Sequence, residues 1–213
     1  MSEITIYGVP QSTYVRTVRM AAEEKGVAYE IVPATPDSAD ITSLHPFAKM
    51  PAVRHGDHVF WETPAITDYI DRAFDGPALM PADPAARALA LSWISAVEDY
   101  IYPVAIRRYV LQYIFPKGAD GQPDRAVIDP AVEEIKGHLQ RIDDQLAKTA
   151  WIGGDDFTLA DCFLAPIMFY VSQMPEGGEM LGAHANIQRT GGMMHERASY
   201  MNTKPPMPGE QAA

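Results

Sequence analysis

The periodicity of hydrophobic and polar positions along the chain changes near residue 76. Before it, helical patterns alternate with short β-rich runs, at residues 4–7, 27–32, 51–54 and 58–61. The first two runs flank a helix that Ser12 or Thr13 caps and Gly26 closes, which is typical of a βαβ unit. The last two flank a glycine turn and predict an antiparallel hairpin. The order βαβ, short helix or loop, ββα therefore predicts a mixed α/β domain over residues 1–76.

A proline-rich linker at residues 77–84 follows, and the rest of the chain is predicted to be helical. One apolar stripe recurs at intervals of three or four residues and predicts an inner helix face: Leu89, Trp93, Val97, Tyr100 and Val104. Pro103 is expected to kink or divide this helix. Residues 85–202 thus predict an all-helical domain, and residues 203–213 a loosely ordered tail.

Further along the helical domain, local signals predict where helices start and break. Asp129 with Pro130 predicts one helix start, and Thr158 with Asp161 resembles a capping box that opens another. The glycines that follow, at 177–178, 182 and 191–192, are expected to interrupt the remaining helices.

Composition and charge exclude several classes of protein. The chain has 213 residues, 47% of them hydrophobic, and a net charge of −11. Nucleic acid and anionic membranes are therefore not expected partners, because binding them requires clustered cations. The single cysteine, Cys162, excludes an intrachain disulfide and a dithiol pair, and its apolar helix predicts a buried thiol. With no apolar run of ~20 residues and no signal peptide, the expected location is the cytoplasm.

Common catalytic and metal motifs are absent from the sequence. It contains no nucleophile elbow, dinucleotide fingerprint, phosphate loop or zinc-protease motif. His55 and His58 flank the hairpin turn and are expected to be solvated rather than to bind a metal. No metal site is predicted.

Three features of the first domain suggest a site for a short peptide-like molecule. Ser12 lies where a strand gives way to a helix, a place that favours an anion. Met50-Pro51 precedes the hairpin, and a cis bond there would turn the Met50 backbone outward to pair with an extended peptide. Glu62 and Thr63 begin the next helix, where N–H groups and a hydroxyl can hold a carboxylate while Glu62 accepts from an ammonium. The structural alternatives are a helix cap at Ser12, a strand start at Pro51 and an N-cap at Thr63.

Taken together, these motifs resemble the cytosolic glutathione S-transferases, nearest to the serine-type, phi-like and bacterial members. The resemblance rests on Tyr7-Gly8-x-x-x-Ser12-Thr13-x-x-Arg16-x-Val18, His45-Pro46-Phe47-Ala48-Lys49-Met50-Pro51-Ala52-Val53, Glu62-Thr63-Pro64-Ala65-Ile66 and Thr158-Leu159-Ala160-Asp161. It implies a thioredoxin-like N-terminal domain, an all-helical C-terminal domain, a homodimer and a role in detoxification. Ala48, Thr63 and Pro64 depart from the residues usual in the family.

The resemblance implies glutathione as co-substrate and assigns roles to single residues. Ser12 would donate its hydroxyl to the glutathione sulfur, with Tyr7 as the rival hydroxyl. The glutathione-binding residues would be Lys49, Met50, Pro51, Glu62 and Thr63. A hydroxyl donor at a helix N-terminus lowers the pKa of a thiol, which is near ~8.5 when unperturbed. The expected reaction is conjugation to a small apolar electrophile, with peroxide reduction, isomerisation and dehalogenation as variants.

The acceptor site and the partner leave alternatives open. A second stripe, formed by Tyr102, Ile106, Tyr109 and Tyr113, is either core or an apolar acceptor wall with hydroxyls. Phe47 is either core or a key that inserts into the second subunit of a homodimer. The alternative to an enzyme is a non-catalytic module of the same fold that binds glutathione, an apolar ligand or a protein.

Overall fold

The structure, a computed structural model, describes residues 3–206, and the chain divides into two compact units. One unit runs to Met80 and also takes in the chain from His195 on, and the other spans Pro81–Met194. The first change of unit falls inside the linker expected at residues 77–84. At the C-terminal side the division differs from the expected one, because residues 195–202 join the first unit instead of the helical one.

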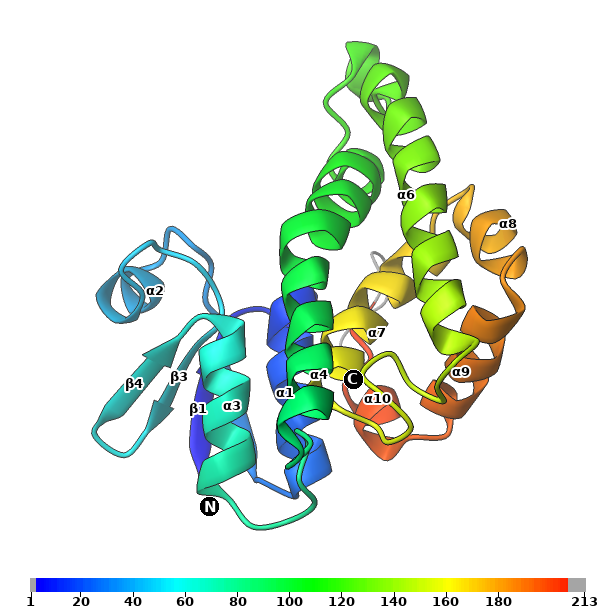
Figure 1. Cartoon of the computed structure of the whole chain (residues 1–213). Coiled ribbons are helices and arrows are strands. Elements are labelled where there is room, and N and C mark those ends of the chain that lie inside the picture. Colours follow the sequence, from blue (N-terminus) through cyan, green and yellow to red (C-terminus); the bar gives the residue numbers. More distant parts are fainter. Residues whose placement is uncertain (1–2, 207–213) are drawn as a thin grey trace. The chain divides into compact units, whose positions relative to one another are not determined.

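The first unit is built on a four-stranded sheet with the strand order β2-β1-β3-β4. Its elements are β1 (Ile4–Tyr7), α1 (Thr13–Lys25), β2 (Tyr29–Val32), α2 (Ala39–Leu44), β3 (Ala52–His55), β4 (His58–Trp61), α3 (Thr63–Ala73) and α10 (Ala198–Asn202) (Figure 1). Strand β1 pairs parallel with β2 and antiparallel with β3, and β3 pairs antiparallel with β4. This topology confirms the predicted thioredoxin-like architecture.

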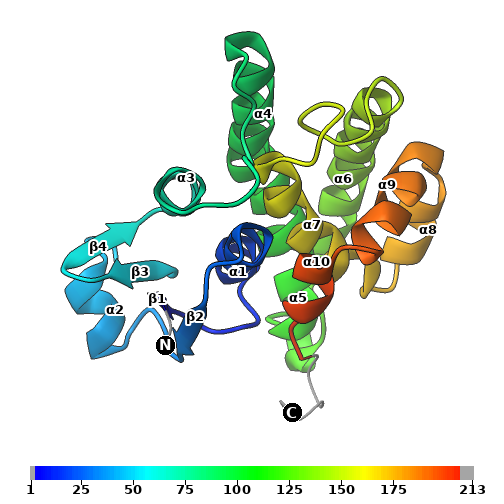
Figure 2. The same ribbon diagram turned by 90° about the horizontal axis from the view of Figure 1, so that it is seen from below.

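Both faces of the sheet are covered, and β1 alternates between them. Ile4 and Ile6 are buried in the main core with Val15 and Val18 of α1 and Ile66 of α3. The opposite face packs on a smaller cluster of Ala34, Ile41 and Ala52, to which α2 contributes. Figure 2 shows α1 and α3 on one side of the strands and α2 on the other. A period of two along the strand is the reason that one short run serves two layers.

Two arginines of α1 hold the C-terminal end of α10. Arg16 is fully buried, donates to the Tyr200 carbonyl at 2.9 Å, and stacks on the Tyr200 ring at 4.3 Å. Arg19 donates to the carbonyls of Asn202 (3.3 Å) and Thr203 (3.1 Å). Carbonyls at a helix C-terminus carry partial negative charge, so two guanidinium groups are suitable partners for them.

Thr203, where the loose tail was expected to begin, is held in place. Thr203 is fully buried, and its hydroxyl accepts from Arg16 Nε at 3.4 Å. The remainder of that prediction, residues 207–213, lies outside the described residues.

The second unit is all-helical, as predicted. Its helices are α4 (Pro84–Ala96), the π-helices η1 (Val97–Ile101) and η2 (Pro103–Val110), α5 (Leu111–Ile114), the short 3-10 helix η3 (Ala119–Gly121), α6 (Arg125–Leu146), α7 (Leu159–Ser172), α8 (Gly177–Gly182) and α9 (Ala185–His195). Helix α7 is buried on nearly all sides, which suits its almost continuous apolar sequence. Within residues 3–206, no helix has the length and hydrophobicity that crossing a membrane requires.

Helix α4 continues into two π-helical segments, and the second begins at Pro103, where the kink or division was expected. Proline has no N–H to donate to the preceding turn, and a π turn includes one more residue than an α turn. The predicted inner face is wrong in part: Leu89 is 38% exposed and Tyr100 is 65% exposed. The buried face is instead formed by Ala90, Ile94, Val97, Ile101 and Val104.

Two further local predictions in this unit are wrong. Helix α6 begins at Arg125, capped by the Asp124 side chain, so Pro130 lies inside the helix and does not open it. Gly191 and Gly192 lie within α9. Both helices are held by buried apolar faces, such as Ile128 in α6 and Ile187 in α9, and this packing overrides the local signals.

Candidate functional site

Ser12 lies at the N-cap of α1 with an extended backbone conformation. Its hydroxyl oxygen accepts from the Val15 N–H at 3.4 Å, so it is the helix cap expected from the structural alternative. A hydroxyl also carries a proton that it can donate while its oxygen accepts. The side chain is half-buried, at a helix N-terminus where an anion is favoured. Capping the helix and donating to a thiolate are therefore compatible roles.

The loop before Ser12 brings the first strand close to α1. A Cβ on Gly8 would lie 2.5 Å from the Val15 side chain, so no other residue fits there without movement. Tyr7, the rival hydroxyl, is at the end of β1, and its ring packs against the Ala34 and Ile41 cluster. The two candidate residues thus occupy different settings, Tyr7 at the end of a strand and Ser12 at a helix N-terminus.

The loop between α2 and β3 contains the expected cis peptide bond, Met50-Pro51. Met50 is half-buried against the core and Lys49 is exposed, while Pro51 is buried. Ala48 has φ of 49°, the left-handed conformation that favours glycine. An alanine where a glycine was expected is therefore held there with backbone strain.

The start of α3 has no side-chain cap. Glu62 occupies the N-cap position with φ of 66°, and its carboxylate makes no capping hydrogen bond. Thr63 is 4% exposed, and Pro64 stands in the first turn, where its missing N–H costs least. An uncapped helix N-terminus is suited to a carboxylate of a ligand, which would take the place of the absent cap.

His45 is a site residue that the sequence pattern does not reveal. Its side chain is buried, Nδ1 accepts from the Phe47 N–H at 3.1 Å, and Nε2 lies 3.8 Å from Glu62 Oε1. Burial lowers the pKa of His45, and nearby Glu62 opposes that shift. The spacing of 17 residues between His45 and Glu62 carries no local signal, so only the fold reveals the pair.

The predicted tyrosine stripe is divided between buried and half-buried positions. Ile106 and Tyr109 are buried, whereas Tyr102 and Tyr113 are half-buried. The hydroxyls of Tyr109 and Tyr113 donate to Glu176 at 3.0 and 2.8 Å. Burial, followed by the bond to Glu176, raises the pKa of Tyr109. The hydroxyls of Tyr109 and Tyr113 are thus engaged inside the unit.

Glu176 is also bound by a cation. Arg125 Nη1 lies 2.7 Å from Glu176 Oε1 and donates to the Tyr113 hydroxyl at the same distance. The pKa of Glu176 is lowered, because these hydrogen bonds outweigh partial burial. The cluster is internally satisfied, which is typical of a structural network.

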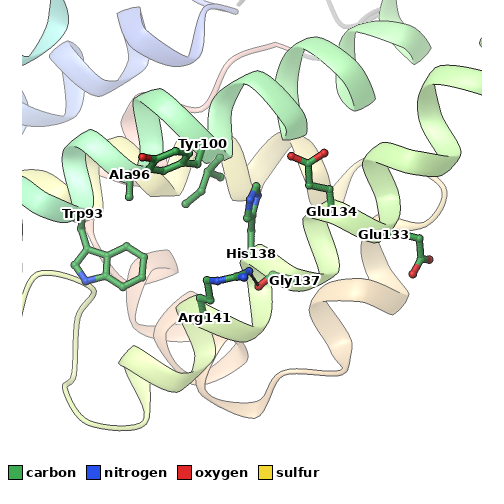
Figure 3. A pocket seen from close by; sticks show the side chains of 9 residues that line it. Trp93, Ala96, Tyr100, Glu133, Glu134, Gly137, His138 and Arg141 are labelled. Carbon is green, nitrogen blue, oxygen red and sulfur yellow. Dashed lines mark hydrogen bonds between the residues drawn. The ribbon is translucent and has the colours of Figure 1, made fainter.

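A separate pocket of about 620 Å³ lies within the second unit (Figure 3). It is lined by Trp93, Ala96, Tyr100, Ile101, Glu133, Glu134, Gly137, His138 and Arg141. Figure 3 shows Trp93 and Tyr100 along one side and His138 and Arg141 along the other. None of the residues of the tyrosine stripe lines it.

The two hairpin histidines lie at the turn between β3 and β4. His55 and His58 face each other in the strand register, and His55 Nδ1 lies 2.7 Å from the Tyr69 hydroxyl. Within residues 3–206, no three histidine, cysteine or acidic side chains gather where they could hold a metal.

Comparison with known proteins assigns the chain to a family. The family models described as the glutathione S-transferase N-terminal and C-terminal domains match residues 6–78 and 125–189. The chain is 32% identical to glutathione S-transferase 1 of Triticum aestivum, over 82% of each chain. It belongs to the glutathione S-transferase family. The segment that matches the N-terminal domain model includes Ser12, Met50 and Glu62.

Solved structures of glutathione S-transferases agree with this assignment. The apo form of a glutathione S-transferase III superposes with a TM-score of 0.85 at 30% identity, covering 97% of this chain and all of that one. A theta-class member from Xanthomonas axonopodis pv. citri, solved with glutathione bound, gives a TM-score of 0.80 at 26% identity, covering 100% of this chain and 99% of that one. The predicted resemblance is confirmed at the level of family and fold.

Proposed function

We propose that this glutathione S-transferase activates glutathione as a thiolate with the hydroxyl of Ser12. The observation that carries the proposal is the placement of that hydroxyl at the N-cap of α1, half-buried, with a proton left to donate. A charge-assisted hydrogen bond and the helix N-terminus both stabilise a sulfur anion. More thiolate at neutral pH makes a faster nucleophile. Tyr7 is the less suitable candidate because it ends a strand, whereas Ser12 caps a helix N-terminus, which stabilises an anion.

The rest of the peptide would be held by the loop at Met50 and the start of α3. The Met50 backbone would pair with the cysteinyl part, and Lys49 would meet a carboxylate. Thr63 and the uncapped helix start would bind the γ-glutamyl carboxylate, and Glu62 would accept from the ammonium.

The bound thiolate would attack a small apolar electrophile. With chlorodinitrobenzene, a carbon–sulfur bond forms, chloride leaves, and the thiol proton passes to solvent. In the tyrosine stripe, Tyr102 and Tyr113 are the members with accessible surface, so any acceptor wall would use these two before Ile106 and Tyr109. Peroxide reduction, isomerisation and dehalogenation would start from the same thiolate.

A titration of bound glutathione tests this proposal directly. Thiolate absorbance against pH should show a pKa of the bound thiol at least one unit below the usual ~8.5. A panel of electrophiles should then give turnover with at least one class. Binding of glutathione with an unshifted thiol pKa and no turnover would indicate the non-catalytic module instead.

We further propose a homodimer in which Phe47 of each copy enters the pocket of the second unit of the other. Phe47 is 67% exposed, so it is not part of its own chain's core. The pocket offers the apolar faces of Trp93, Tyr100 and Ile101, and Leu89 is also exposed on α4. A contiguous exposed apolar patch marks an interaction surface, and Phe47 forms one with Trp61, whose ring centroid lies 6.0 Å away and which is 38% exposed.

Light scattering at micromolar concentration tests the dimer. The wild type should have twice the mass of one chain, and Phe47→Ser should shift it toward the mass of a single chain. Phe115→Ser is the matched control, since Phe115 is 64% exposed and does not line the pocket. A single-chain mass for the wild type would refute the homodimer, and an intact dimer in Phe47→Ser would refute the role of Phe47.

A further inference from the structure

One buried histidine lies beside the proposed ammonium site with one ring nitrogen already in use. The His45 side chain is 2% exposed, and Nδ1 accepts from the Phe47 N–H at 3.1 Å. A neutral imidazole has one acceptor and one donor nitrogen, so the proton is on Nε2. That nitrogen is the one that lies 3.8 Å from Glu62 Oε1.

We propose that His45 is a positioning residue, which orients the Glu62 carboxylate so that it can receive the ammonium group of glutathione. This inference rests on the proposed function, since it concerns the same glutathione site. The separation of 3.8 Å is longer than a hydrogen bond, but the Glu62 side chain is 55% exposed and can move toward a fixed ring.

The surroundings of the ring support a fixed, neutral donor. Burial lowers the pKa of His45, Lys49 acts in the same direction, and Glu62 opposes it. The ring is held among aromatic neighbours, with its centroid 5.5 Å from that of Trp61 and 6.4 Å from that of Phe47. A neutral ring leaves the full negative charge of Glu62 available to a cation, whereas a protonated histidine would compete for it.

Orienting the Glu62 carboxylate should change the affinity for the ammonium group by a measurable amount. An exposed glutamate loses side-chain freedom when it binds an ammonium, and this loss weakens binding. A fixed donor that the carboxylate can reach by a small movement favours one orientation and reduces the loss. The effect should therefore appear in the affinity for the ammonium group and not in the affinity for the rest of the peptide.

Two substitutions separate this role from a role in holding the loop. In His45→Asn, the amide oxygen can still accept from the N–H two residues on, but the side chain no longer reaches Glu62. In His45→Gln, the terminal amide can donate to Glu62, but the short loop bond is lost. His58→Asn is the matched control, because His58 is exposed on the hairpin.

The probes are glutathione and glutaryl-cysteinylglycine, which lacks only the ammonium group, with affinities measured by titration calorimetry. The wild type should prefer glutathione. His45→Asn should weaken glutathione binding about 3- to 10-fold, leave the analogue's Kd unchanged, and keep the melting temperature. His45→Gln should keep most of the preference and melt at a lower temperature, and His58→Asn should match the wild type.

The outcomes distinguish this inference from the proposed function. A wild type that binds neither peptide would refute the proposed function. A wild type that binds both equally, or a His45→Asn variant that keeps the preference or weakens both peptides alike, would overturn the role of His45 alone. If His45→Asn does not fold, His45→Gln decides, because loss of the preference there also overturns the inference.

Discussion

The two compact units differ in whether their polar side chains are hydrogen-bonded within the fold. In the first unit, Ser12, Glu62 and Thr63 lie at the beginnings of helices and keep hydrogen-bonding capacity for a ligand. In the second, Glu176 is already bound by Tyr109, Tyr113 and Arg125. Polar groups that are satisfied within the fold stabilise it, whereas those left at helix starts are available for chemistry.

This contrast predicts opposite consequences for substitutions in the two units. Changes at the helix starts of the first unit should reduce activity with little loss of stability. Changes in the satisfied networks of the second should reduce stability first.

Ser12→Ala should have the largest effect on activity. Loss of the hydroxyl donor should raise the pKa of bound glutathione and slow conjugation by roughly 10- to 1000-fold. Loss of the helix cap should cost only about 1 kcal/mol of stability. Steady-state kinetics, thiolate titration and thermal melts measure the three quantities. If Ser12→Ala leaves the thiol pKa unchanged but lowers the melting temperature, Ser12 only caps the helix. If Tyr7→Phe slows conjugation and Ser12→Ala does not, Tyr7 is the residue that activates the thiol.

Asp161→Ala should have the largest effect on stability. The Asp161 carboxylate accepts from the N–H groups of Ile152 and Thr158, both at 2.9 Å, and is almost fully buried. Removing it leaves buried donors without partners, at a cost of about 2–4 kcal/mol. Urea unfolding measures this cost. Asp155→Ala, at an exposed position, should stay within about 0.5 kcal/mol of the wild type, and an equal loss in both variants would contradict the expectation.

Tyr109→Phe decides between core and acceptor wall for the tyrosine stripe. Removal of a buried hydroxyl that donates to Glu176 should cost about 1 kcal/mol of stability, since Tyr113 and Arg125 still bind the carboxylate. Thermal melts and the KM for the acceptor are the measurements. A changed acceptor KM with an unchanged melt would place this hydroxyl in the electrophile site.

Ala48→Gly should have the smallest effect, and it should stabilise the protein. The left-handed conformation of Ala48 destabilises the folded protein by about 1–2 kcal/mol. Glycine removes this strain, but its greater conformational freedom stabilises the unfolded chain and offsets about half of the gain. A gain of about 0.5 kcal/mol in urea unfolding is expected. Ala88→Gly, on the exposed face of α4, should lose about 1 kcal/mol. A loss at both positions would mean that the loop is not strained.

Local signals were sufficient where an element begins or ends at the surface of the first unit. The cap at Ser12, the closing Gly26 and the cis bond before Pro51 were all predicted, because each depends on a few neighbouring residues. The same kind of signal failed at Pro130 and at Gly191, which lie inside helices. There, burial of an apolar face contributes more free energy than a single unfavourable residue removes.

The sequence by itself determined the family, the order of the elements and the glutathione-site candidates, since motifs and periodicity are properties of neighbours along the chain. Only the tertiary structure decided which face of α4 is buried, because its apolar residues offer two neighbouring faces and packing buries Ala90 and Ile94 while Leu89 stays exposed. It also decided that Phe47 is exposed and that His45 lies against Glu62. Burial and pairing between distant residues depend on how strands and loops pack in space, and no local spacing encodes that.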